Sequence, residues 1–237
     1  DIALQNLKVA ICMDRGGLSG DDGPTHHGLF DIGYLRHVPN LVFCTPKDEA
    51  EFVDMLWTMN HYNAGPIAIR YPRGTGTGAT PSAQPKLLEI GKAEVIRHAP
   101  SNHNFVALFG LGNLCAMASE TAQLLEAEGI PAAVINPRWI KPLDTGTLEF
   151  FARSAAVLCS FEEHTLTNGF GSAILEHLSS ANIQTPVVRI GWPDEFIEHG
   201  AVEILRKKHG VTPQAAVAKI KESLALKHSH SAAQAKA

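Results

Sequence analysis

A glycine-rich stretch near the start of the chain holds the residues best suited to chemistry. It reads DRGGLSGDDGPTHHGLFD and spans residues 14–31. Glycines let a backbone approach a ligand closely, and the exposed N–H groups of such a loop can bind an anion. Arg15 opens the stretch, and Arg73 follows a later strand-like run. Two guanidinium groups at neighbouring strand ends could grip one phosphate. The composition fits a plain surface loop equally well.

The same stretch contains two adjacent histidines, His26 and His27. An imidazole can move protons near neutral pH, which makes a histidine a candidate acid or base. Adjacent residues of an extended loop point apart, so at most one of the two is expected to face a site. A solvated or locally hydrogen-bonded histidine is the alternative for each.

Two further motifs offer weaker candidates. Glu162 and Glu163 close a strand-like run and precede NGFGSA, a plausible helix start. They could act as an acid–base pair, but a helix cap or an interface is the favoured interpretation. FGLGN, residues 109–113, could hold an anion at a helix N-terminus. It lacks the full GxGxxG spacing, so a tight strand–helix turn is favoured.

Composition narrows the class of protein. The chain has 237 residues, 45% apolar and 19% charged, with a net charge of −4. These values are ordinary for a globular protein and give no broad basic field, so neither nucleic acid nor a membrane surface is expected as a partner. No apolar run could span a bilayer and no signal peptide is present, which predicts a cytoplasmic protein. The four cysteines lie far apart in apolar runs and are predicted to be buried, reduced thiols: Cys12, Cys44, Cys115 and Cys159.

The first unit shows a strand–helix–strand alternation typical of a parallel sheet. Residues 8–13, 41–44 and 66–72 are expected to be buried strands. A helix is predicted between the last two strands, with Thr45 as its N-cap and Pro46 in its first turn. Its predicted buried face carries Ala50, Val53, Leu56 and Trp57. A Gly, Thr, Ser and Pro-rich linker is expected over residues 75–91.

The alternation resumes after the linker and predicts a complete α/β domain over residues 92–226. The expected strands are residues 104–110, 131–137, 155–163 and 186–191, and the expected helices are residues 113–128, 144–153, 168–179 and 212–226. The tail, residues 227–237, lacks an apolar period and is expected to be disordered. The first unit, residues 1–74, has few strands for a free-standing sheet, so the chain is expected to be cut from something longer.

Several motifs together resemble one known family. DRGG, GPTHHGLFD, YLR and RYPRG occur in the first unit, and PRWIKPLD, EEHTLTNGFGSA and IGWPDEFIEHG occur in the second. At these spacings the chain resembles the 1-deoxy-D-xylulose-5-phosphate synthases, thiamine-diphosphate enzymes related to transketolase. The resemblance covers nearly all of the chain except the tail, and it matches about the last third of a family member.

The resemblance implies a fold and a reaction. Residues 1–74 would form the C-terminal part of the pyrimidine-binding domain, a partial parallel-sheet domain, and residues 92–226 would form a complete transketolase C-terminal-type α/β domain. The family condenses pyruvate with glyceraldehyde 3-phosphate and releases carbon dioxide, which feeds isoprenoid precursors, thiamine and pyridoxal. Its members form homodimers.

The resemblance also implies roles for individual residues. Arg15 and Arg73 would bind the phosphate of glyceraldehyde 3-phosphate, and Asp22 would contact its hydroxyl or aldehyde end. His26, the histidine of GPTH, would face the reacting carbons as the catalytic residue. The resemblance implies no functional role for His27.

Thiamine diphosphate and Mg²⁺ are the implied cofactors. The resemblance places their ligands mainly in an N-terminal portion that precedes Asp1, so the expected partner is that portion and no metal ligand is assigned to this chain. The chain alone is therefore expected to be inactive. The alternatives are a transketolase-like or 2-oxo acid dehydrogenase E1 β-like subunit that pairs with another chain, and a non-catalytic oligomerisation module.

Overall fold

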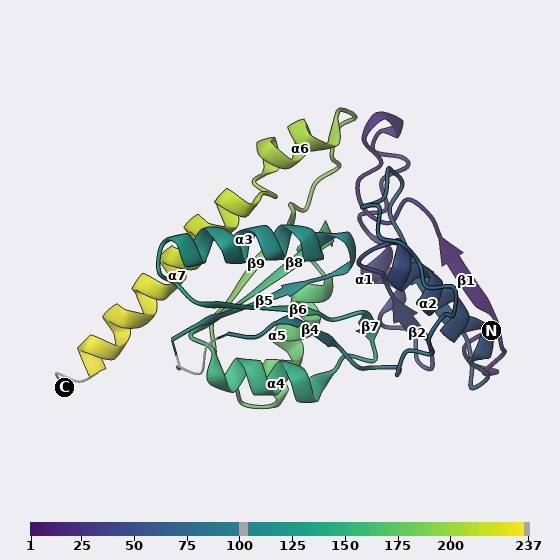
Figure 1. The fold of residues 1–237 in the computed structure, drawn as a ribbon, viewed down its shortest axis with the longest axis horizontal. Coiled ribbons are helices and arrows are strands. Elements are labelled where there is room, and N and C mark those ends of the chain that lie inside the picture. Colours follow the sequence, from purple (N-terminus) through teal and green to yellow (C-terminus); the bar gives the residue numbers. More distant parts are fainter. Residues whose placement is uncertain (100–103, 235–237) are drawn as a thin grey trace.

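The first unit is built on short parallel strands. The structure is a computed structural model that describes residues 1–99 and 104–234. Strands β1 (Ala10–Met13), β3 (Ile67–Arg70) and β2 (Val42–Cys44) lie side by side and run parallel, and helix α2 (Glu49–His61) connects β2 to β3 (Figure 1). A 3₁₀ turn, η1 (Gly20–Asp22), and helix α1 (Asp31–Leu35) lie between β1 and β2. The parallel strand–helix–strand arrangement predicted from the alternation is confirmed.

A strand from the second unit completes this sheet. Strand β7 (Trp139–Lys141) pairs antiparallel with β2, which gives the order β1-β3-β2-β7. The sequence pattern did not predict β7, because three residues are too few to show a period. Trp139 of β7 is fully buried among Val42, Cys44 and Met55 of the first unit. The two units therefore share a sheet as well as a chain.

The second unit is a larger sheet covered by helices on both faces. Its strand order is β4-β6-β5-β8-β9, in which β4 is antiparallel and the other strands are parallel. The strands are β4 (Glu94–Arg97), β5 (Val106–Gly110), β6 (Ala132–Asn136), β8 (Val157–Thr165) and β9 (Val187–Trp192). The helices are η2 (Gly112–Leu114), α3 (Cys115–Ala127), α4 (Thr145–Ser154), α5 (Phe170–Ser180), α6 (Val202–His209) and α7 (Pro213–Gln234). The predicted strands and helices of this unit are confirmed, and β4 and α6 are additional.

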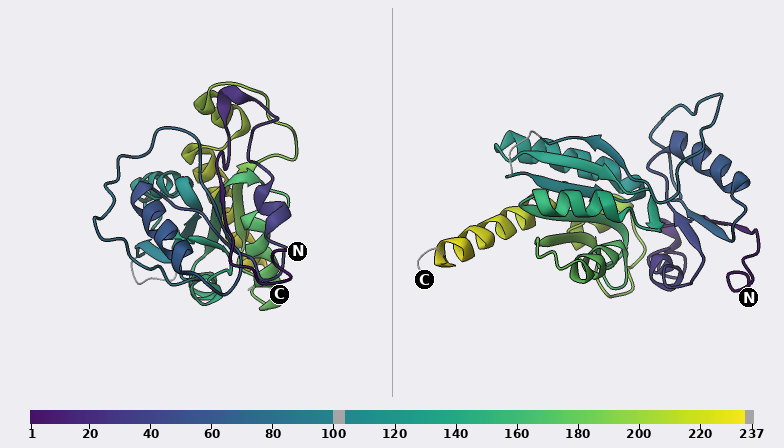
Figure 2. Two further views of the ribbon diagram at one scale, coloured as in Figure 1. Left: turned by 90° about the vertical axis from the view of Figure 1, so that its right-hand side faces the viewer. Right: turned by 90° about the horizontal axis from the view of Figure 1, so that it is seen from below.

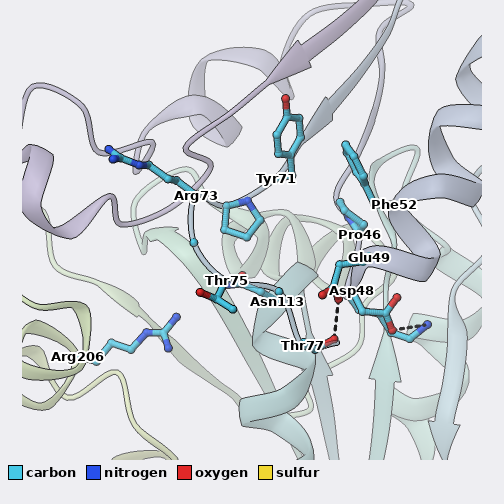
Figure 3. Close-up of a pocket in the computed structure, with 14 residues that line it drawn as sticks. Pro46, Asp48, Glu49, Phe52, Tyr71, Arg73, Thr75, Thr77, Asn113 and Arg206 are labelled. Atoms are coloured by element: carbon cyan, nitrogen blue, oxygen red, sulfur yellow. Dashed lines mark hydrogen bonds and ion pairs between the residues drawn. The ribbon is translucent and has the colours of Figure 1, made fainter. Parts of the chain in front are cut away.

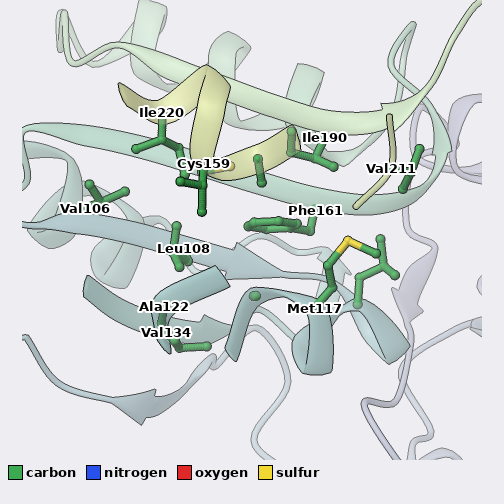
Figure 4. Packing of buried hydrophobic residues seen from close by; sticks show 14 of the residues in the cluster. Val106, Leu108, Met117, Ala122, Val134, Cys159, Phe161, Ile190, Val211 and Ile220 are labelled. Atoms are coloured by element: carbon green, nitrogen blue, oxygen red, sulfur yellow. The ribbon is translucent and has the colours of Figure 1, made fainter. Parts of the chain in front are cut away.

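Two apolar clusters sandwich the second sheet. One lies under α3 and α7 and includes Leu108, Phe161 and Ile220 (Figure 4). The other lies under α4 and α5 and also takes in Phe43 and Ala68 from the first unit. Figure 2 shows the first unit packed at one end of this sheet, with α7 leading away at the other. Burial of apolar surface therefore joins the two units into one body.

Helix α2 departs from its prediction at both its cap and its buried face. Its N-cap is Asp48, whose carboxylate accepts the Glu51 N–H at 2.8 Å. Thr45 instead continues the strand, since its N–H donates to the Arg138 carbonyl at 3.0 Å. The predicted apolar face is wrong, because Leu56 and Trp57 are exposed. The buried face also has helical spacing and is shifted by one to two residues, to Glu51, Met55, Thr58 and Met59.

Two predictions of burial or order are corrected. Cys12 is exposed, whereas the other three cysteines are buried and unpaired. The reason is that β1 lies at the edge of its sheet, where its residues alternate between exposed and partly buried. The tail is helical up to Gln234, because α7 continues well past residue 226; residues 235–237 lie outside the described residues. No helix within 1–99 and 104–234 is long and apolar enough to span a membrane.

Candidate active site

The glycine-rich stretch forms a closed loop. Gly17 and Gly28 exchange two backbone hydrogen bonds of 2.9 and 2.8 Å, which tie residues 17–28 at their base. We call residues 17–28 the site loop. A Cβ atom at Gly28 would lie 2.1 Å from the Arg15 carbonyl oxygen, so only glycine fits this crossing. The stretch is therefore a fixed loop that starts where β1 ends, rather than a free surface segment.

Three of the four predicted site residues meet at one point. The Asp22 Oδ2 atom accepts from Arg15 Nε at 3.1 Å and from Arg73 Nη1 in an ion pair. The hydrogen bond from Arg73 is the largest cause that holds the pKa of Asp22 below its usual value. Arg15 has a φ of +56°, a left-handed conformation that is unusual for a non-glycine residue and is commonest at functional sites. The carboxyl ends of parallel β1 and β3 lie at one sheet edge, and this brings the two arginines together.

The two histidines point in different directions, as expected. His26 is exposed, and its Nδ1 atom lies 2.9 Å from the Thr25 hydroxyl. His27 is buried; its Nδ1 accepts the Ser19 N–H at 3.1 Å, and its Nε2 then donates to the Glu198 carbonyl at 3.3 Å. His27 is therefore a structural residue of the site loop and not a bystander. His26 lies on the same loop as Asp22, and its ring is not bonded to the arginine cluster in the described part of the chain.

Arg70 supports the base of the site from inside the protein. Its Nε donates to the buried Asp31 carboxylate at 2.7 Å, and its Nη2 donates to the carbonyls of Gly28 and Glu163, both at 3.0 Å. The partner of Arg70, Asp31, is only 4% exposed, so this ion pair lies inside the protein. Arg70 is therefore a buried structural residue. Of Arg70 and Arg73, it is Arg73 that faces solvent.

A pocket of about 350 Å³ lies beside Arg73. Figure 3 shows Arg73 on the loop after β3, with Arg206 of α6 and Asn113 also lining the space. The loop after Arg73 is held by Glu49, which accepts from the Thr77 hydroxyl at 2.7 Å and from the Gly78 N–H at 2.8 Å. These bonds, the backbone one first, lower the pKa of Glu49 to about 2. Glu49 therefore holds the part of the pocket wall that Thr77 forms.

The two weaker motifs have structural roles. Glu162 caps α5, accepting the N–H groups of Phe170 and Gly171, as favoured from the sequence. Glu163 accepts from Trp192 Nε1 at 3.0 Å and from Arg206. No sequence pattern predicts either of these partners. In FGLGN, Gly112 forms the tight turn, with a φ of +62° and a Cβ position only 2.6 Å from the Thr45 hydroxyl. Neither motif offers a free anion site.

The side chains that could bind a metal ion do not cluster in the described residues. Within residues 1–99 and 104–234, no three side chains of His, Cys, Asp or Glu gather closely enough to hold a metal ion. The ligands of a metal-bound diphosphate are therefore not assigned to these residues.

Comparison with known families defines the class of this protein. Residues 1–77 match the transketolase pyrimidine-binding domain, and residues 91–215 match the transketolase C-terminal domain. The chain belongs to the transketolase family. The α/β architecture expected for the two domains is confirmed.

Within that family the chain is similar to the C-terminal portion of 1-deoxy-D-xylulose-5-phosphate synthases. It is 58% identical to the synthase of Methylacidiphilum infernorum over 92% of this chain and 34% of that protein. It is 52% identical to the synthase of Acidobacterium capsulatum over 93% of this chain and 34% of that protein. The chain thus spans about a third of the length of these curated relatives. The resemblance seen in the sequence motifs is confirmed.

Solved structures agree with this class. A structure described as a split-gene transketolase, inactive β4 tetramer, superposes with a TM-score of 0.80 at 30% identity and covers 95% of this chain and 70% of its own chain. Transketolase from Leishmania mexicana superposes with a TM-score of 0.68 at 18% identity, covering 94% of this chain and 31% of its own, which supports the fold alone.

Proposed function

We propose that this chain supplies the acceptor-binding half of a 1-deoxy-D-xylulose-5-phosphate synthase site. The whole enzyme condenses pyruvate with glyceraldehyde 3-phosphate and releases carbon dioxide, acting as a cytoplasmic homodimer. The observation that carries the proposal is the convergence of Arg15 and Arg73 on Asp22 beside a pocket. The similarity to named synthases over more than nine-tenths of the chain supports it.

The two arginines suit a phosphate. Each guanidinium carries five N–H donors in a planar fork that matches phosphate oxygens. Asp22 engages Nε of Arg15 and Nη1 of Arg73, so it takes one donor from each fork. The two forks come from separate strand ends, and a phosphate between them would be fixed in position as well as bound.

Asp22 acts as an anion in the place where substrate charge will sit. A phosphate dianion that approaches Arg15 and Arg73 repels the Asp22 carboxylate and competes for the same donors. The carboxylate then turns towards the substrate hydroxyl or aldehyde end, which needs a hydrogen-bond acceptor or a polar neighbour. The free site is thereby kept polar and preorganised, without two unpaired cations side by side.

His26 is proposed to orient the reacting carbons or to move a proton at the acceptor carbonyl oxygen. It is exposed on the site loop, and its Nδ1 contact with Thr25 leaves Nε2 as the atom directed away from that hydroxyl. Thiamine diphosphate, when bound, supplies the electron sink that pyruvate needs to lose carbon dioxide. Mg²⁺ and the diphosphate ligands are assigned to the N-terminal portion.

Replacing Arg73 by alanine in the complete enzyme tests the phosphate assignment. A lost hydrogen bond to a charged group costs about 1.5–3 kcal/mol, so KM for glyceraldehyde 3-phosphate should rise roughly 10- to 100-fold. KM for pyruvate should change little. Arg153→Ala is the matched control, because Arg153 is an exposed arginine paired only within its own helix to Glu149. An equal rise of both KM values, or a rise for pyruvate alone, contradicts the assignment.

Mixing this chain with the N-terminal portion of a synthase tests whether both portions are needed for activity. The chain alone should give no product, and the mixture should release carbon dioxide and form product when both substrates and cofactors are present. Size-exclusion chromatography of the mixture shows whether the two polypeptides associate. Turnover by this chain alone contradicts the proposal.

A split transketolase-like subunit is the second candidate, and one observation favours it. The structure described as an inactive β4 tetramer of a split transketolase shares 30% identity with 95% of this chain. That tetramer is described as inactive, as this chain alone is expected to be. The donor substrate separates the two candidates: a synthase decarboxylates pyruvate, whereas a transketolase takes its two-carbon unit from a ketose phosphate.

A further inference from the structure

The C-terminal unit holds the site loop at both its base and its tip. At the base, the Leu18 N–H donates to Glu163 Oε2 at 3.4 Å, and the Thr165 N–H donates to the Leu29 carbonyl at 3.0 Å. At the tip, the Gly200 N–H donates to the Gly20 carbonyl at 3.2 Å. The side chains of Leu18 and Leu29 also lie in the core cluster under α3 and α7. The loop belongs to one family domain but rests on the other.

Glu163 lies at the centre of the contacts at the base. It is 2% exposed, and both of its carboxylate oxygens have partners. Oε2 accepts from Trp192 Nε1 at 3.0 Å as well as from Leu18, and Oε1 accepts from Arg206 Nε at 3.1 Å. A buried carboxylate held by a guanidinium and an indole has little freedom to move. Its position therefore fixes the position of whatever packs on it.

The site loop has two stems, at Gly17 and at Gly28. The first packs directly on Glu163, and the second is bound by Arg70, which also binds Glu163. A Cβ atom at Gly17 would lie 2.8 Å from Glu163 Cβ, so the backbone of the first stem packs directly on this side chain. The second stem is held through Arg70, which donates to the carbonyls of both Glu163 and Gly28. Since Arg15 lies two residues before the first stem and Asp22 lies within the loop, a shift at Glu163 moves both.

We propose that Glu163, oriented by Arg206, is a positioning residue through which the C-terminal domain aligns Arg15 and Asp22 with the acceptor substrate. This inference rests on the proposed function, and it gives the C-terminal domain a direct part in substrate binding. A misplacement of about 1 Å in such a site can reduce the rate about 100-fold. Loss of the Glu163 contacts should therefore weaken acceptor binding without removing any group that touches the substrate.

Amide hydrogen exchange on this chain tests the positioning without any turnover. Glu163→Gln replaces one carboxylate oxygen by an NH₂ group, so that an N–H donor faces another donor instead of an acceptor. Amide exchange across residues 15–28 should therefore speed up at least 10-fold. Arg206→Gln removes the partner of Glu163 from a partly exposed position and serves where Glu163→Gln fails to fold. Arg206→Lys keeps the charge and should restore part of the protection. Arg153→Gln is the control and should leave exchange unchanged. Unaltered exchange of residues 15–28 in the folded variants overturns the inference.

Steady-state kinetics of the chain joined to its N-terminal portion provides the second test. Glu163→Gln should raise KM for glyceraldehyde 3-phosphate about 10-fold and leave KM for pyruvate unchanged. In an Arg15→Ala background the same substitution should have a smaller effect, because part of its action passes through Arg15. Fully additive effects overturn the positioning role.

The two proposals fail in different ways. If the proposed function is wrong, the acceptor KM will not respond to Arg73→Ala. If only this inference is wrong, the acceptor KM will respond to Arg73→Ala and not to Glu163→Gln or Arg206→Gln.

Discussion

At the scale of single residues, Glu162 shows burial outweighing a favourable hydrogen-bond environment. Its carboxylate is fully buried and accepts two backbone N–H groups at the start of α5. Those bonds favour the charged form, but burial is the larger effect and raises the pKa of Glu162 to about 7. The folded chain therefore favours the protonated acid below about pH 7.

The raised pKa of Glu162 predicts a pH dependence of stability. Below about pH 4.5 the group is protonated in both the folded and unfolded states. Between that pH and about 7 only the unfolded chain releases the proton, so the folded state binds more protons and its stability falls as pH rises. The loss should reach about 3 kcal/mol at most and level off above pH 7. Denaturant unfolding of the chain and of Glu162→Gln from pH 4.5 to 8 should show this slope in the original chain only. Equal slopes in the two proteins contradict the prediction.

Which site residues could be predicted depends on how far apart their partners lie. Arg15 and Arg73 follow neighbouring parallel strands, so their approach could be predicted from the alternation of strands and helices. Glu163 could not be linked to the site, because its partner Leu18 is 145 residues away and nothing in a local pattern records that contact. His27 was misjudged for the same reason, since Glu198 is 171 residues away.

At the scale of elements, the site loop depends on a crossing where no side chain fits. Gly28→Ala should open the base of the loop, because its Cβ would lie 2.1 Å from the Arg15 carbonyl oxygen. Overpacking of this kind typically costs about 1–3 kcal/mol. The free energy of unfolding should fall by that amount, and amide exchange across residues 17–28 should accelerate. Gly146→Ala is the control, because the nearest atom to its new Cβ would be Asp144 Oδ1 at 3.6 Å, an ordinary contact, and its helix should be unharmed. Equal effects of the two substitutions argue against a special crossing at Gly28.

Elements were predicted well where burial is complete on both faces. β5, the first four residues of β6 and the first three residues of β8 are buried and apolar, and they therefore show as unbroken apolar runs. β4 is only partly buried, and β7 has three residues, so neither has a clear period. The buried face of α2 includes Glu51, a charged residue that pattern reasoning excludes from a core. Arg138, which donates to it at 2.6 Å, comes from the other unit.

At the scale of the whole molecule, a cut in the linker should not separate the two units. The segment around residues 80–84 is exposed, whereas β7 and the shared core clusters join the units on the inside. After cleavage at a protease site introduced there, the two fragments should elute together in size-exclusion chromatography. Trp139→Ala should weaken the association, because Trp139 is fully buried among residues of the first unit. Trp57→Ala, at an exposed tryptophan, is the control. Fragments that separate without any substitution contradict this prediction.

The crossing of β7 into the neighbouring sheet bears on how this protein family could be recombined. A chimaera that joined the first unit to the C-terminal domain of a distant relative would also replace the outer strand of the first sheet. Residues 139–141 pair with β2 and are separated in sequence from it by about 95 positions. Evolutionary exchange of the C-terminal domain is therefore constrained by a strand that lies within it but belongs structurally to its neighbour. A designed exchange should retain Trp139 and Lys141 together with residues 1–77.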